Sequence, residues 1–139
     1  MSRRRTVITG VSMLTPVGLT TSDSFDRLYA GHSGARPITL FDASGYSTTF
    51  ACQLPEDYAA LEKRHTSKRF GRQTVRGTRL GYVAVKQLLE AYPIPFETLN
   101  RRRLGLSLGV SGASAEQSSP TDQWEIVKSM INALPAWVS

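Results

Sequence analysis

A chain of 139 residues is at most one domain of ordinary size, and its 40% hydrophobic and 20% charged residues are typical of a folded globular protein. No apolar run is long enough to span a membrane, and residues 6–13 are a poor signal-peptide core, so we expect a cytoplasmic protein. The single cysteine, Cys52, excludes an internal disulfide, and one cysteine with two histidines is too few for a metal site.

The formal net charge of +6 comes largely from two basic clusters, at residues 63–79 and 101–103. Three interpretations stay open for these cations: a solvated surface, a docking face for an acidic protein, and a nucleic-acid contact. Against nucleic acid, the chain has no zinc-finger spacing, no RNA-binding strand signature and no helix-turn-helix pattern.

The first elements alternate between strand and helix. Residues 6–13 are rich in β-branched and apolar side chains, and they predict a buried strand that ends in a turn at Pro16 and Gly18. A helix over 23–30 follows, which Gly31 ends. Its candidate N-caps are Thr20, Thr21 and Ser22, and its apolar side is formed by Phe25, Leu28 and Tyr29.

The region after this helix predicts a loop over 31–45 and a short strand over 48–54. Cys52 lies in that strand, and we expect it to be a small buried side chain, because no second cysteine or histidine stands near it.

Helical patterns dominate the next forty residues. A short helix is expected over 56–64 and a longer one over 67–92, which Pro93 and Pro95 would end. Residues 104–110 alternate apolar and small side chains, which predicts a strand that other backbone can approach closely.

A loop over 112–119 and a last helix from Ser119 complete the pattern. The chain finishes on large apolar residues, so we expect the native continuation to lie in a second chain or a cleaved segment. The order of elements predicts a mixed α/β layer architecture.

No catalytic constellation is evident from spacing alone. His32 and His65 are predicted to be surface histidines, because neither can be paired with a nucleophile. The segment 109–112 follows a predicted strand but lacks the lysine of a phosphate-binding loop, so we interpret it as a tight turn and expect no cofactor.

Several blocks occur in the order found in one enzyme family. They are Thr9-Gly10 with 14–18, 31–42, Phe50-Ala51, 68–70, 108–112 and 131–139. In these blocks the chain resembles the N-terminal portion of a β-ketoacyl synthase, of the ketosynthase and chain-length-factor type.

The resemblance implies the first part of a thiolase-like layered α/β/α fold, incomplete in this chain, with residues 1–139 as its N-terminal portion. In the family, a cysteine takes the acyl chain as a thioester, and two histidines support decarboxylation of a malonyl carrier and carbanion attack. By the same alignment these residues lie beyond Ser139, so none is carried onto this chain and Cys52 is not the nucleophile.

Basic residues carry the partner predictions. At the helical spacing expected for 67–92, one stripe would hold four cations where the family has a more apolar helix: Arg69, Arg72, Arg76 and Arg79. The resemblance implies that an acyl carrier protein docks at Lys68 and Arg69, with Arg64 beside them. It further implies a homo- or heterodimer interface near Gly109, Ser111 and Gly112. The arginine stripe departs from the family, and it is either a solvated surface or a docking face for the carrier or a partner subunit, in which case Arg72 and Arg76 belong to the interface.

These observations predict the N-terminal part of an acyltransferase of fatty-acid or polyketide biosynthesis. It would act in decarboxylative Claisen condensation and be inactive without a complementary chain or segment that carries the nucleophilic cysteine. Three alternatives stay open: a chain-length-factor-like partner subunit, a non-catalytic basic binding module, and a fragment without a function of its own.

Overall fold

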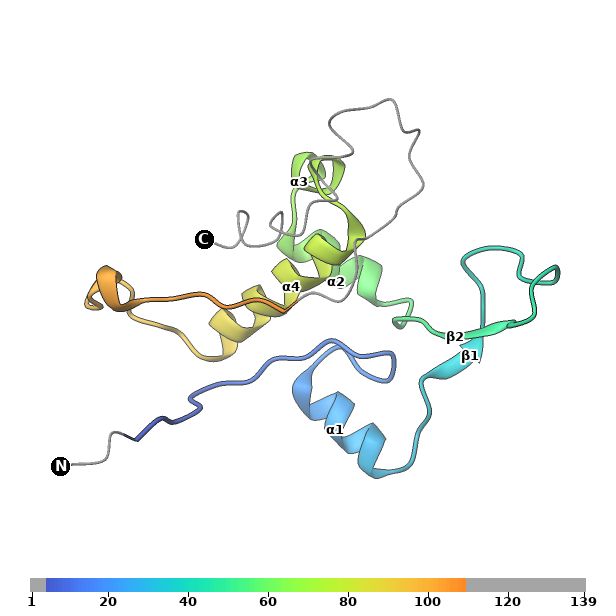
Figure 1. Cartoon of the computed structure of the whole chain (residues 1–139), viewed down its shortest axis with the longest axis horizontal. Helices are drawn as coiled ribbons and strands as arrows, with labels where there is room; N and C mark the ends of the chain where they lie inside the picture. Colours follow the sequence, from blue (N-terminus) through green and yellow to red (C-terminus); the bar gives the residue numbers. More distant parts are fainter. Residues whose placement is uncertain (1–4, 110–139) are drawn as a thin grey trace. The chain divides into compact units, whose positions relative to one another are not determined.

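The computed structural model describes residues 5–109, and the chain divides into two compact units between Ala60 and Leu61. Along the chain the elements are α1 (Thr21–Tyr29), β1 (Ala35–Pro37), β2 (Phe50–Cys52), α2 (Tyr58–His65), α3 (Lys68–Gln73), α4 (Arg76–Ala91) and the 3₁₀ turn η1 (Arg101–Arg103) (Figure 1). Within residues 5–109, no helix is both long and apolar enough to cross a bilayer.

The predicted first strand does not form. Residues 5–15 have no regular structure, and the side chains of Val7 and Ile8 are 67% and 86% exposed. A strand is stabilised by pairing with a neighbour, and the only ladder among the described residues joins β1 to β2. The expected turn is present, because Thr15 and Gly18 exchange backbone hydrogen bonds of 2.9 and 3.2 Å.

Helix α1 confirms the predicted helix and begins two residues earlier than expected. The side chain of Thr20 caps it by accepting a hydrogen bond from the backbone N–H of Asp23 at 3.1 Å. Gly31 follows the last turn with φ of +79°, a left-handed conformation that glycine adopts without steric cost.

Strands β1 and β2 form an antiparallel pair in which Arg36 lies opposite Ala51. The prediction of a continuous loop over 31–45 is therefore wrong, because a three-residue strand is too short to leave a periodic signal. The guanidinium of Arg36 donates to the carbonyls of Gln53 and Leu54 and so fastens the pair.

The prediction that Cys52 is buried is also wrong, because its side chain is exposed. It lies on β2, and the two-stranded ladder gives that strand a single neighbour and too little cover to bury a side chain.

The single helix predicted over 67–92 is interrupted. Thr74 and Val75 have extended backbones, with φ of −133° and −77°, between α3 and α4. Both residues are β-branched and both are buried, and the hydroxyl of Thr74 donates to the carbonyl of Phe70 at 2.7 Å. The four arginines therefore do not share one helical stripe, because the break separates Arg72 from Arg76.

Residues 104–109 form no strand, and they are largely exposed. As with residues 6–13, no described segment pairs with them. The loop expected over 112–119 and the helix expected from Ser119 lie outside the described residues.

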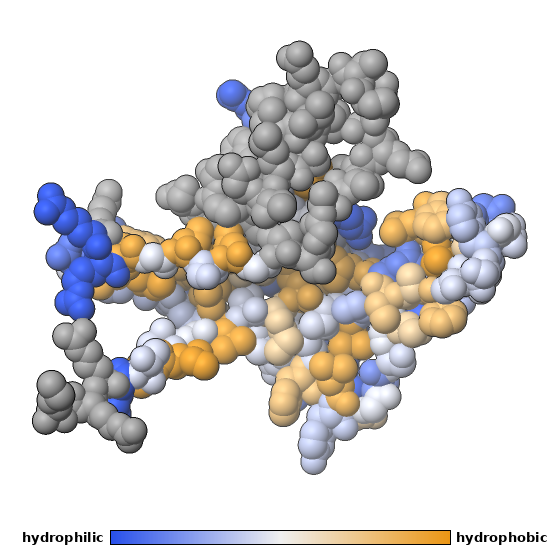
Figure 2. Space-filling model, viewed as in Figure 1, coloured by the Kyte–Doolittle hydropathy of each residue, from blue (hydrophilic) through white to orange (hydrophobic). Residues whose placement is uncertain are grey.

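Burial is sparse among the described residues. The buried apolar side chains are those of Val17, Ala43, Tyr58, Phe70, Val75 and Val83. Within residues 5–109, by contrast, sixteen large apolar side chains are exposed, and Figure 2 shows apolar residues on the visible surface. Helices and a short sheet are present, as the mixed α/β prediction requires, but a layered core is not visible in residues 5–109.

Candidate functional site

The three predicted docking residues flank one short connection. Arg64 lies in the last turn of α2, and Lys68 and Arg69 open α3. All three are exposed, and only His65, Thr66 and Ser67 separate Arg64 from Lys68. The structure therefore brings the predicted cations together at the α2–α3 connection.

Hydrogen bonds fix the path of this connection. The hydroxyl of Thr66 donates to the carbonyl of Glu62 at 2.7 Å, which satisfies a carbonyl near the end of α2. The side chain of Ser67 accepts from the backbone N–H of Phe70 at 3.1 Å and caps α3. The two bonds hold the end of one helix and the start of the next.

Helix electrostatics separate these cations into two groups. Lys63 and Arg64 lie in the last turn of α2, where the negative end of the helix dipole favours a positive charge. Lys68 and Arg69 lie in the first turn of α3, where the dipole disfavours one. Helix stability thus explains why Lys63 and Arg64 are basic, but it does not explain the charges of Lys68 and Arg69.

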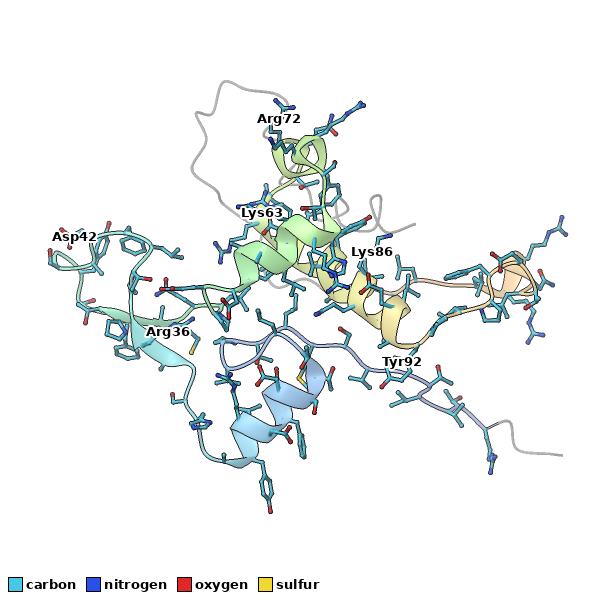
Figure 3. All side chains as sticks on the ribbon, turned by 180° about the vertical axis from the view of Figure 1, so that it is seen from behind. Arg36, Asp42, Lys63, Arg72, Lys86 and Tyr92 are labelled. Atoms are coloured by element: carbon cyan, nitrogen blue, oxygen red, sulfur yellow. The ribbon has the colours of Figure 1, made fainter. Side chains whose placement is uncertain are left out.

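The remaining arginines of the predicted stripe occupy different environments. Arg72 and Arg76 are exposed, and Figure 3 shows the side chain of Arg72 extending away from α3. Arg79 is only 18% exposed, and its Nε lies 2.9 Å from a carboxylate oxygen of Glu62. Its guanidinium also donates to the carbonyls of Gly71 and Thr74, so it has a structural role and does not belong to the surface stripe.

The two histidines differ as well. His32 is exposed, as predicted. His65 is not a surface histidine, because its side chain is only 4% exposed and its Nδ1 lies 3.4 Å from a carboxylate oxygen of Glu90. Neither belongs to a group of three or more potential metal ligands among residues 5–109.

Of the predicted interface residues in 109–112, Gly109 is the one that the structure describes. Gly109 is exposed, and a side chain added there would meet no atom within 4 Å, so no described backbone approaches it closely. Ser111 and Gly112 lie outside the described residues.

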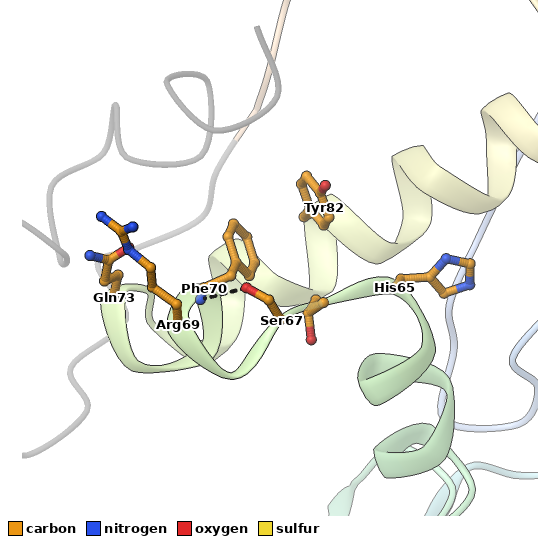
Figure 4. Close-up of a pocket in the computed structure, with 7 residues that line it drawn as sticks. His65, Ser67, Arg69, Phe70, Gln73 and Tyr82 are labelled. Carbon is orange, nitrogen blue, oxygen red and sulfur yellow. Dashed lines mark hydrogen bonds between the residues drawn. The ribbon is translucent and has the colours of Figure 1, made fainter.

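A pocket beside Arg69 was not predicted from the sequence. Its volume is about 470 Å³, and it is lined by His65, Thr66, Ser67, Arg69, Phe70, Gln73 and Tyr82 (Figure 4). The rings of Phe70 on α3 and Tyr82 on α4 lie 4.6 Å apart between their centroids. The pocket exists because the break at Thr74 and Val75 turns α3 back toward α4, and no local pattern signals that break.

Comparison with known proteins decides the family. Residues 3–139 match the model of the β-ketoacyl synthase N-terminal domain. The chain belongs to this family. The resemblance seen in the opening blocks is therefore confirmed, and this chain corresponds to an N-terminal ketosynthase portion.

Individual relatives come from fatty-acid and polyketide biosynthesis. The chain is 37% identical over 109 residues to 3-oxoacyl-[acyl-carrier-protein] synthase 2 of Vibrio harveyi, which covers 78% of this chain and 26% of that protein. It is 34% identical over 112 residues to the granaticin polyketide putative β-ketoacyl synthase 1 of Streptomyces violaceoruber, which covers 81% of this chain and 26% of that protein. It is 30% identical over 110 residues to the tetracenomycin polyketide synthase ketoacyl synthase alpha subunit of Streptomyces glaucescens, which covers 79% of this chain and 25% of that protein.

The chain thus spans about a quarter of the length of these curated relatives. Their names describe these longer proteins.

Proposed function

We propose that this ketosynthase chain is the N-terminal part of a β-ketoacyl-(acyl carrier protein) synthase that performs decarboxylative Claisen condensation. The match of residues 3–139 to the N-terminal domain of that family carries the proposal. The relatives act in both fatty-acid and polyketide assembly, so the proposed substrates are an acyl thioester and a malonyl group on a carrier protein.

The catalytic cysteine and two histidines are proposed to be supplied outside residues 1–139. A thiol takes the acyl chain as a thioester, loss of CO₂ from the malonyl carrier leaves a carbanion, and attack on the thioester carbon forms the C–C bond and releases the thiol. The relatives' greater length supports this division, as do the sixteen large apolar side chains exposed among residues 5–109.

The role of this chain is then to supply scaffold, docking and interface surfaces of a layered thiolase-like fold. Unpaired segments 5–15 and 104–109 are proposed to become strands when neighbours from the rest of the domain pair with them. The dimer interface is proposed to include Arg72, Arg76 and the region around Gly109. The relative named an alpha subunit supports a partner of ketosynthase type.

Carrier docking is proposed at Lys68 and Arg69, with Arg64 contributing. Carrier proteins are acidic, and complementary charge mainly steers encounter and orientation. Lys68 and Arg69 are exposed at a helix start that gives them no stabilising role, which favours a function in binding.

Complementation tests the catalytic proposal. The chain is mixed with the Vibrio harveyi synthase 2 lacking its matching N-terminal quarter, together with acyl and malonyl carrier thioesters. Mass spectrometry should find a β-ketoacyl carrier with both polypeptides and none with either alone. Condensation by this chain alone would contradict the division of labour, and no product with either this complement or that of the Streptomyces glaucescens relative would contradict the proposed synthase role.

Charge reversal tests the docking proposal. The Lys68→Glu/Arg69→Glu variant should bind a bacterial acyl carrier protein at least tenfold more weakly, a loss of about 1.4 kcal/mol or more. The Arg102→Glu/Arg103→Glu variant makes the same charge change at two adjacent exposed arginines and should bind normally. Equal losses in both variants would indicate attraction by net charge alone.

The basic-module alternative has its own readout. Binding to RNA or DNA with a steep salt dependence, and no preference for the carrier protein, would replace the docking proposal with a nucleic-acid function.

A further inference from the structure

The pocket beside Arg69 has an aromatic wall and a polar rim. Figure 4 shows Arg69 and Gln73 at one end, His65 at the other, and the rings of Phe70 and Tyr82 between them. Phe70 is buried, at 9% exposure, and its ring on α3 contacts the ring of Tyr82 on α4. The lining therefore offers an apolar surface with one cation at its edge.

The surroundings of the pocket are positively charged. The exposed cations Lys63, Arg64, Lys68 and Arg72 lie on the helices that form it. Of the nearby carboxylates, Glu62 pairs with Arg79, and Glu90 lies 3.4 Å from Nδ1 of His65. Charge complementarity therefore selects an acidic occupant.

We infer that the pocket receives an apolar side chain of the acidic carrier that docks on Lys68 and Arg69. The inference rests on the docking proposed above and adds an anchor to it. Protein interfaces gain most of their affinity from a few apolar or aromatic anchors, around which charged groups form a solvent-accessible rim. Here the ring pair provides the anchor site, Arg69 lies at its rim, and Lys68 precedes Arg69 on α3.

Selectivity follows from this arrangement. Lys68 and Arg69 attract any acidic surface, whereas the pocket accepts only one that presents a leucine, methionine or aromatic side chain beside its carboxylates. The charges thus set the rate of encounter, and the apolar contact sets the lifetime of the complex.

Filling the pocket tests the inference with the full chain and a purified bacterial acyl carrier protein as probe. Gln73→Trp places an indole at the pocket rim and should weaken carrier binding by about tenfold, while the salt dependence is unchanged. Ala91→Trp puts the same indole on an exposed residue outside the pocket and should leave binding unaltered. Gln73→Phe is a smaller filling variant that guards against misfolding, which circular dichroism would report.

A double-mutant cycle identifies the occupant. Each exposed leucine, methionine or aromatic residue next to an acidic residue of the carrier is replaced by alanine in turn. One alanine variant of the carrier should bind the Gln73→Trp chain as tightly as the unaltered carrier does. The side chain that this variant lacks is already kept out of the filled pocket.

The outcomes separate the two proposals. Carrier binding that depends on Lys68 and Arg69 but not on Gln73→Trp or Gln73→Phe would overturn the pocket inference alone. Binding insensitive to Lys68→Glu/Arg69→Glu would overturn the docking proposal and the inference with it. The loss of binding free energy in Gln73→Trp could instead add to the loss in every carrier variant. That result would indicate a small molecule or another segment as the occupant and would also overturn the inference.

Discussion

The Nε atom of Arg79 lies 2.9 Å from Oε1 of Glu62, and this ion pair joins α4 to the end of α2. The same guanidinium donates to the carbonyls of Gly71 and Thr74, at the end of α3. One side chain thus connects three helices around the break that shapes both the docking connection and the pocket.

Replacing Arg79 should destabilise this unit. Arg79→Met leaves the largely buried carboxylate of Glu62 and the carbonyl of Thr74 without this donor, which we expect to cost about 1–3 kcal/mol. Urea unfolding measures the loss, and hydrogen exchange should rise at the amides of 70–75. The exposed pair Arg27–Asp23 is the matched control, and Arg27→Met should cost about 0.5 kcal/mol or less. Equal losses in the two variants would refute a special role for Arg79.

Two substitutions of Ser67 should separate helix capping from carrier docking. Ser67→Ala removes the cap of α3 and should cost about 1 kcal/mol. Ser67→Asp keeps a capping oxygen but adds a negative charge next to Lys68, so stability should be retained while carrier affinity falls. Hydrogen exchange of α3 and carrier titrations measure the two effects. Parallel changes of stability and affinity in both variants would contradict the separation.

Opposite effects are expected from the same substitution at two glycines. Gly31→Ala forces a side chain into the left-handed region at φ +79° and should destabilise by about 1–2 kcal/mol. Gly71 lies within α3, where an added Cβ meets nothing within 4 Å, so Gly71→Ala should stabilise by about 0.5–1 kcal/mol. Thermal unfolding checks both. Stabilisation by Gly31→Ala would show that α1 does not need a left-handed residue after its last turn.

The carboxyl group of Asp42, at the tip of the β1–β2 loop in Figure 3, should titrate below its ordinary pKa of 3.8. The backbone N–H of Ser44 and then its hydroxyl lower this pKa by hydrogen bonding to the carboxylate. Because the folded pKa is the lower one, the contribution to stability is present above pH 3.8 and is lost as pH falls through the folded value.

An NMR titration of Asp42 measures this pKa directly. In Ser44→Ala the pKa should rise toward 3.8 but remain below it, because the backbone hydrogen bond persists. A pKa of 3.8 or above in the unaltered chain would contradict the loop geometry.

Features that depend on neighbouring residues alone were predicted well. Thr20 and Gly31 bound α1 because a capping oxygen and a left-handed φ act within a few residues. The turn at Thr15–Gly18 and the helix α2 follow the same logic. The family was also evident from the order of short blocks, which the match over 3–139 confirms.

The positions of the basic residues follow from the sequence. Lys68, Arg69 and Arg64 are exposed and flank one connection, as their closeness in sequence required, and their role in docking stays a prediction. Arg79 was wrongly grouped with the surface cations, because its partner Glu62 lies on a different helix and helical spacing says nothing of such contacts.

The sequence by itself determined the family, the helix caps and the positions of the basic residues, because each of these depends on local order along the chain. The tertiary structure alone decided that the long helix breaks at Thr74 and Val75, that the side chain of His65 is covered and that Cys52 is exposed. Burial and pairing join residues far apart in sequence, and a segment such as 6–13 becomes a strand only where another segment is present to pair with it.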